Sequence, residues 1–164
     1  MSRATPPLEK IVELPVLLDL LAGRRADGER IVLTNGCFEL LHRGHVRYLA
    51  AAAKLANLLV VGLNSDASVR ALKGLGRPLV PEHERAEVLA ALGCVDFVLI
   101  FDAPTAEGLV EALKPEVYAK GGDYADRSPP EAALVQRLGG EFRVLELIHD
   151  SSTTALVQRI RGRY

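Results

Sequence analysis

Short apolar runs alternate along the chain with segments in which apolar residues return at helical spacing. The runs are apolar at successive positions, a pattern typical of strands covered on both faces, as in a parallel sheet. They lie at 31–33, 58–63, 97–100, 117–119 and 144–148. The pattern therefore predicts five buried strands in one parallel sheet.

The segments between these runs predict helices. Residues Val46, Leu49, Ala50 and Ala53 follow the i, i+3, i+4, i+7 pattern of an amphipathic helix. Similar stripes occupy 106–113 and 153–160, with Ser151 or Ser152 as a candidate cap of the second. A further stripe spans 81–92 and opens with Pro81, which suits a first helical turn. A helix at about 8–21 contains Pro15, where we expect it to kink or break.

Repeated alternation of strand and helix predicts an α/β fold with a doubly wound, five-stranded parallel sheet and right-handed crossovers. We expect one globular unit at 30–164, preceded by a helical segment at 1–29. Ligands of such sheets bind beyond the carboxyl ends of the strands, where the strand order reverses. The loops that follow the strands are therefore the expected location of the chemistry.

Composition narrows the class of protein. The 164 residues are 49% hydrophobic and 25% charged with a net charge of −1, as in one ordinary globular domain. The chain lacks the block of basic residues that would indicate a nucleic-acid partner. It also has no apolar run that approaches the roughly 20 residues needed to span a bilayer. The two cysteines form no CxxC pair, so neither a zinc site nor a disulfide is predicted and we expect a cytoplasmic protein.

One loop carries the strongest candidate chemistry. Residues 34–45 leave the first predicted strand and enter the helix that begins near Gly44. A helix N-terminus offers unpaired N–H groups to phosphate, and imidazoles at His42 and His45 can donate to phosphoryl oxygens. The loop lacks the Gly-Lys-Ser/Thr of a phosphate-binding Walker motif and the Gly-x-Gly-x-x-Gly of dinucleotide binders. Spacing alone is equally compatible with two polar loop histidines, one of them a helix cap.

The motif His42-Arg43-Gly44-His45 and the run before it resemble the His-x-Gly-His region of cytidylyltransferase-like nucleotidyltransferases, which have a Rossmann-like fold. Further similar motifs lie at 64–69, 72–74, 77–78, 84–85, 120–124 and 152–154. Together they look like the adenylyltransferase domain of the ADP-heptose synthase family, over roughly residues 8–161. In many relatives this domain follows a sugar kinase, which we expect to be a separate protein here.

The resemblance implies transfer of AMP from ATP to a heptose 1-phosphate, with Mg²⁺ arriving with ATP and no dedicated protein metal site. It implies a homo-oligomer, with ATP and a sugar phosphate as the small-molecule partners. It implies catalytic roles for His42, His45 and Lys73. The implied nucleotide-binding residues are Asn35, Gly36, Cys37, Phe38, His42, Gly44, His45, Lys120, Gly121, Asp123, Ser152, Thr153 and Thr154. The implied substrate-binding residues are Glu39, Asn64, Asp66, Lys73, Arg77 and Arg85.

Two of the implied substrate-binding residues, Glu39 and Lys73, have features of their own in this sequence. Glu39 stands where the family usually has Asp, which is one methylene shorter. Lys73 precedes Gly74-Leu75-Gly76, and we expect it to lie in a glycine-flanked loop that closes over ligand.

Other functions remain open. The nearest is glycerol-3-phosphate cytidylyltransferase, whose tryptophan motif is absent from this chain, which has no Trp. FAD synthetase-like adenylyl transfer is a second alternative. A non-catalytic nucleotide-binding module is a third, although the histidines, Lys73 and the 152–154 hydroxyls are all present.

Overall fold

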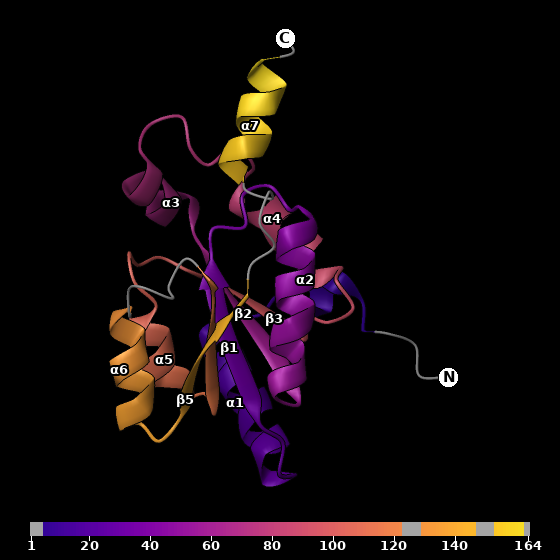
Figure 1. Cartoon of the computed structure of the whole chain (residues 1–164). Coiled ribbons are helices and arrows are strands. Elements are labelled where there is room, and N and C mark those ends of the chain that lie inside the picture. The colour runs from indigo at the N-terminus through magenta and orange to yellow at the C-terminus, as the bar shows by residue number, and fades with distance from the viewer. Residues whose placement is uncertain (1–4, 123–128, 147–152, 163–164) are drawn as a thin grey trace.

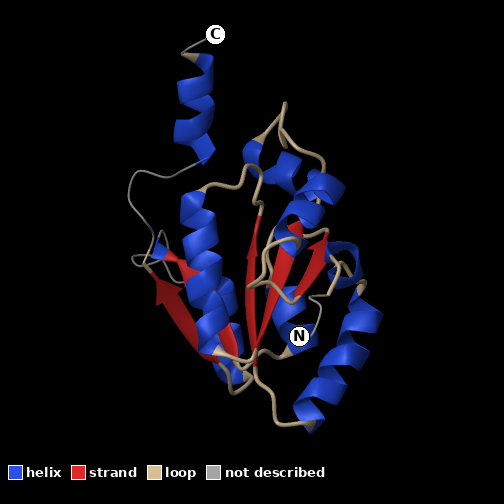
Figure 2. Cartoon of the chain, turned by 90° about the vertical axis from the view of Figure 1, so that its right-hand side faces the viewer, coloured by secondary structure: helices blue, strands red, loops and turns tan. Residues whose placement is uncertain are grey.

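The computed structural model describes residues 5–122, 129–146 and 153–162. Five parallel strands form one sheet in the order β3-β2-β1-β4-β5. Figure 2 shows the twisted sheet among the helices that cover it. The strands are β1 (Ile31–Gly36), β2 (Leu58–Asn64), β3 (Phe97–Phe101), β4 (Val117–Gly121) and β5 (Glu141–Leu145). The predicted five-stranded parallel sheet is confirmed.

Helices connect and flank these strands (Figure 1). The α-helices are α1 (Leu14–Ala26), α2 (Arg43–Ala52), α3 (Asp66–Lys73), α4 (Glu82–Ala90), α5 (Glu107–Leu113), α6 (Pro130–Arg137) and α7 (Thr153–Arg161). Short 3-10 helices are η1 (Pro7–Lys10) and η2 (Ala53–Leu55). Within the described ranges, none of the helices has both the length and the apolar character needed to cross a membrane.

The core consists of two layers, one on each face of the sheet. Helices α2 and α4 pack on one face, against side chains such as Val32 and Val61. Helices α1, α5 and α6 pack on the other face, against the alternate residues Leu33 and Val60. Because successive strand residues point to opposite faces, apolar runs without alternation are what a sheet covered on both sides requires. The predicted doubly wound arrangement is thereby confirmed.

The predicted N-terminal helix is divided just ahead of its proline, and its second part runs to Ala26 instead of ending near residue 21. Helix η1 ends at Lys10, and α1 begins at Leu14 with Pro15 in its first turn, where a missing N–H costs nothing. Between them Ile11 bridges to Val98 of β3, and from the end of η1 the Lys10 Nζ donates to the Val95 carbonyl at 2.8 Å. The segment is therefore tied to the β3 edge of the sheet.

Three local predictions need correction. Strand β5 spans Glu141–Leu145 instead of 144–148, and residues 147–148 lie outside the described part of the chain. It is an edge strand and half exposed, so Glu141 and Arg143 alternate with Phe142 and leave no continuous apolar run at its start. Helix α4 begins after Pro81 and ends at Ala90, and Lys73 closes helix α3 instead of lying in the following loop. The sequence pattern had assigned no range to α3 or α6.

The strand order reverses between β1 and β4. The β1 ladder pairs six residues with β2, but pairs only Val32 with Val117 and Leu33 with Tyr118 of β4. The carboxyl ends of β1 and β4 are therefore not joined by ladder hydrogen bonds. In doubly wound sheets this reversal point is where ligands bind.

Candidate active site

Two stacked histidines stand at the N-terminus of α2, directly after the carboxyl end of β1. His42 is the N-cap residue, and its Nδ1 accepts a hydrogen bond from the Gly44 N–H at 3.2 Å. A neutral ring that accepts at Nδ1 carries its proton on Nε2, which is left as the donor. The His45 ring stacks on it with centroids 3.8 Å apart, and the Phe38 ring meets His45 edge-on at 5.3 Å. The cap and the anion-donor interpretations of this pair are therefore compatible.

Both histidines are neutral near pH 7 in this arrangement. Burial lowers the pKa of His42. Burial, followed by the proximity of His42, lowers the pKa of His45 to about 4, although the Leu40 carbonyl opposes this. His45 Nδ1 is buried and has no hydrogen-bond partner among the described residues. His42 can therefore offer its Nε2–H to an anion, while positive charge has to come from other side chains.

The gap between β1 and β4 is bridged by side chains instead of backbone. The Tyr48 hydroxyl, from α2, donates to the Ala119 carbonyl of β4 at 2.9 Å and hydrogen-bonds the Thr34 hydroxyl of β1. The Tyr118 hydroxyl donates to Asn35 Oδ1 at 2.6 Å. Both tyrosines hold the two strand ends at a fixed separation, and neither was singled out from the sequence.

Lys120 lies at the same strand ends. Its ammonium is 3.4 Å from the Asn35 carbonyl and 5.7 Å from the centre of the Tyr118 ring. Burial lowers the pKa of Lys120 to about 8, and the nearby Glu131 carboxylate partly offsets this. The side chain thus supplies a positive charge to the reversal point at neutral pH. The structure brings Asn35, Gly36, Lys120 and Gly121 together there, as the resemblance implied.

The backbone of the loop after β1 is shaped by small residues. A Cβ at Gly36 would lie 3.1 Å from the Phe38 ring, and Phe38 itself has a positive φ of 41°. Cys37 lies between them, half-buried, and burial raises the pKa of its thiol. The thiol is therefore protonated near neutral pH.

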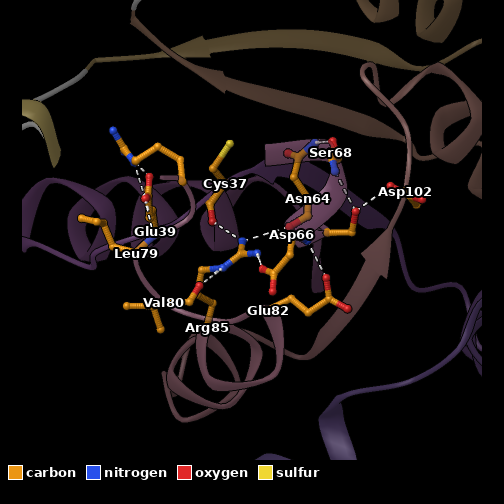
Figure 3. A network of polar contacts seen from close by, with 12 residues as sticks. Cys37, Glu39, Asn64, Asp66, Ser68, Leu79, Val80, Glu82, Arg85 and Asp102 are labelled. Carbon is orange, nitrogen blue, oxygen red and sulfur yellow. Dashed lines mark hydrogen bonds and ion pairs between the residues drawn. The ribbon is translucent and has the colours of Figure 1, made fainter. Parts of the chain in front are cut away.

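Arg85 is the central cation of a buried network (Figure 3). Its guanidinium donates to the carbonyls of Val80 at 2.9 Å, Cys37 at 2.6 Å and Asn64 at 2.9 Å, and to Asp66 Oδ1 at 2.7 Å. The side chain is almost wholly inaccessible to water. Arg85 thus ties α4 to the ends of β1 and β2, and its contact with substrate stays a prediction.

Glu39 anchors the connection that follows α3. Its buried carboxylate accepts from Arg77 Nε and Nη2, from the Leu79 N–H at 2.6 Å and from Lys73 Nζ at 3.4 Å. Burial by itself would raise the pKa of Glu39, but the hydrogen bonds from Arg77 and Leu79 and the charge of Lys73 lower it to about 2. The structure therefore gathers three residues that the resemblance assigned to substrate binding: Glu39, Lys73 and Arg77.

The remaining candidate residues fall into three groups: two near Arg85, two at the start of α7, and two outside the described part of the chain. Asn64 Nδ2 donates to Ser68 Oγ at 2.8 Å, and Asp66 begins α3, so both belong to the network around Arg85. Thr153 and Thr154 open α7, which extends beyond the carboxyl edge of the sheet (Figure 1). Asp123 and Ser152, like the proposed cap Ser151, lie outside the described residues.

Two stacked histidines and a buried lysine thus stand at the reversal point of a parallel sheet, the arrangement expected of the nucleotidyltransferase class. The sequence model of the cytidylyltransferase-like family matches residues 33–159. The chain belongs to the cytidylyltransferase-like family and is a nucleotidyltransferase.

Its relatives include long proteins described as bifunctional protein HldE. The chain is 50% identical to the protein of Pelobacter propionicus over 94% of its own length, and 49% identical to that of Pseudomonas aeruginosa over 93%. It is 46% identical to the protein of Geobacter sulfurreducens over 94%. In each case the chain spans about a third (32%) of the length of the relative.

A solved structure shares the fold. The protein from Thermoplasma volcanium, described as a lipopolysaccharide core biosynthesis protein, superposes with a TM-score of 0.60 at 24% identity. The match covers 74% of this chain and 98% of the other. This likeness supports the Rossmann-like arrangement of the sheet.

Proposed function

We propose that this chain transfers AMP from ATP to a heptose 1-phosphate, releasing pyrophosphate and forming ADP-heptose for lipopolysaccharide. The observation that carries the proposal is the stacked His42–His45 pair at the N-terminus of α2. The near-50% identity to HldE proteins over almost the whole chain supports heptose as the sugar. We further propose a cytoplasmic homo-oligomer whose small-molecule partners are ATP and the sugar phosphate.

In the proposed reaction an oxygen of the sugar phosphate attacks the α-phosphorus of ATP. A bond forms between that oxygen and the α-phosphorus, and the bond from the α-phosphorus to the oxygen bridging to the β-phosphorus breaks. The electron pair leaves with pyrophosphate. A phosphate monoester is already ionised near neutral pH, so no side chain has to remove a proton. Catalysis then rests on placement and charge stabilisation.

The side chains of the site divide these tasks. The Nε2–H of His42 is free to donate to a phosphoryl oxygen, and His45 lies against it. Lys120 and Lys73 supply positive charge from the β4 and α3 sides of the pair. Thr153 and Thr154 at the start of α7 are suited to the terminal phosphates of ATP, because hydroxyls and N–H groups meet at a helix N-terminus. Tyr48 and Tyr118 keep the strand ends in place.

Mg²⁺ fits this site as a companion of ATP. Two carboxylates of the candidate site are already paired with cations, Glu39 with Arg77 and Asp66 with Arg85. Over the described residues, no three His, Cys, Asp or Glu side chains gather as a metal cage. Phosphate oxygens and water would therefore hold most of the coordination sphere, and the ion would offset charge on the phosphates.

The test is a pyrophosphate-release assay with purified protein, Mg²⁺ and each of the four nucleoside triphosphates. Acceptors are heptose 1-phosphate and glycerol 3-phosphate, which separates heptose adenylylation from the cytidylyltransferase alternative. We expect release with ATP and heptose 1-phosphate, and loss of release on chelation of Mg²⁺. Pyrophosphate release with none of the pairs would contradict the proposal and favour a non-catalytic nucleotide-binding module.

A further inference from the structure

The Glu39 carboxylate has close hydrogen bonds from Arg77 and Leu79 and a longer contact with Lys73. Arg77 donates two N–H groups to it and the Leu79 N–H donates at 2.6 Å, so these contacts fix residues 77–79 against the loop after β1. Lys73 makes a single contact at 3.4 Å, and its side chain is 34% exposed while that of Glu39 is 0% exposed. Lys73 can therefore leave Glu39 without disturbing the anchor formed by Arg77 and Leu79.

Lys73 also lies beside the loop that carries the histidine pair, because its Nζ contacts Glu39, which stands three positions before His42. In agreement with this placement, its positive charge acts to lower the pKa of both His45 and Cys37. Lys73 closes α3 immediately before Gly74, whose φ of 89° turns the chain away from the helix. The Lys73 ammonium therefore stands at the end of α3, in contact with Glu39 and next to the loop that leads to His42 and His45.

An anion that reaches the histidines competes with Glu39 for this lysine. The negative charge of Glu39 is already offset by the bidentate Arg77 contact. A phosphate monoester carries up to two charges near neutral pH and has no such partner when it arrives. Attraction between unit charges a few ångströms apart at a protein surface is large enough to move a flexible lysine.

We propose that Glu39 is a positioning residue that tunes affinity for the acceptor phosphate. Its carboxylate holds Lys73 in the ligand-free chain and yields Lys73 to the phosphate, while Arg77 and Leu79 stay in place. The identity of the anion as the acceptor's phosphate rests on the proposed function. The exchange of Lys73 between carboxylate and phosphate rests on the contacts of Glu39 and on the position of Lys73 beside the loop that carries the histidines.

The substitution Glu39→Gln separates charge from shape. Glutamine keeps an oxygen that can accept from the Leu79 N–H and from one Arg77 N–H, but it has no charge with which to hold Lys73. With the competitor neutralised, phosphate should bind more tightly instead of less. Loss of a merely structural contact would weaken binding or leave it unchanged, so the direction of the change is diagnostic.

Glu116 provides a matched control. Its carboxylate also accepts from an arginine and a backbone N–H, namely Arg25 Nε at 3.1 Å and the Ile31 N–H at 2.8 Å. It stands just before β4, at the amino end of the sheet and therefore away from the histidines. The substitution Glu116→Gln thus removes a comparable charge pair outside the candidate site.

The experiment measures binding of inorganic phosphate by calorimetry at constant ionic strength. The full chain is compared with E39Q, K73M, the double variant and E116Q. We expect E39Q to lower the dissociation constant by about threefold or more, and this gain to vanish in the K73M background. E116Q should stay within about twofold of the parent chain, because its charge lies at the opposite end of the sheet and is screened by salt.

Weaker or unchanged binding in E39Q overturns the proposal, and so does an equal gain in the K73M background. Absence of phosphate binding in both the parent chain and E39Q overturns it as well. If the E39Q variant does not fold, the phosphate affinity and the melting temperature of the K73M variant test the proposal instead. It should weaken phosphate binding about threefold or more while its melting temperature stays within about 2 °C, because its ion pair is loose and partly exposed. A K73M variant that binds phosphate normally would refute the exchange.

This cycle is independent of turnover. A chain that shows the Lys73-dependent gain but releases no pyrophosphate would retain the exchange at an anion site and lose the proposed function. A chain that releases pyrophosphate without the gain would keep its function, and Glu39 would lose its positioning role.

Discussion

Replacing Arg85 with methionine tests whether this cation braces the site or binds phosphate directly. The buried guanidinium donates to Val80, Cys37, Asn64 and Asp66, which belong to separate segments of the chain. Methionine fills much of the volume but leaves three carbonyls and one carboxylate without their donor. Leaving a buried acceptor without its donor costs about 1–3 kcal/mol for each group, and Asp66 is partly exposed, so we expect a total cost of about 3–5 kcal/mol.

That cost sets the expected measurement. For a domain of this size, each kcal/mol shifts the melting temperature by about 2–4 °C, so Arg85→Met should melt roughly 6–20 °C lower. Calorimetry or circular dichroism measures this shift, with Arg70→Met on the exposed face of α3 as the control, expected within about 2 °C. If Arg85 has only a structural role, Arg85→Met lowers the melting temperature, and any loss of phosphate affinity follows from that loss of stability. Unchanged melting together with a loss of phosphate affinity of about tenfold or more would refute the brace and make Arg85 a direct ligand.

Three further predictions concern the site itself. His45→Ala should lower kcat about 10²-fold or more with unchanged folding, the usual scale for a preorganised donor, and a fall of less than about fivefold would exclude that role. Lys120 has its pKa lowered to about 8, so nucleotide affinity should be highest below that pH and decline as pH rises through it. Titration calorimetry on the parent chain and on Lys120→Met measures this, and the same decline in both would assign it to another group. Tyr48→Phe should cost about 1–3 kcal/mol in urea unfolding, because the Ala119 carbonyl loses its buried donor. A cost near zero would mean that water replaces the hydroxyl.

Much of the fold could be predicted from the sequence because burial on both faces of a parallel sheet leaves a direct trace. Runs such as 58–63 have to be apolar at every position, since one face meets α4 and the other meets α5. The same logic fails at the sheet edge. There Glu141 and Arg143 point toward solvent, so the start of β5 had no apolar pattern to reveal it.

The candidate site was predictable where its residues are consecutive. His42 and His45 are separated by one helical turn, so their proximity follows from local geometry once α2 begins at Arg43. Tyr118 and Asn35 are 83 positions apart, and no sequence pattern in either segment predicts their hydrogen bond. Such pairs depend on the register between β1 and β4, which is set by packing of the whole sheet.

The sequence by itself determined the class of fold, the histidine pair and the resemblance that leads to adenylyl transfer, because local periodicity and contiguous motifs carry that information. Only the tertiary structure decided how the charged side chains pair. It placed Arg85 inside a buried brace and brought Glu39 against Lys73 and Arg77, which are 34 and 38 positions away in the chain. The physical reason is that a buried charge needs a partner, and the fold, not the spacing, decides which partner lies within reach.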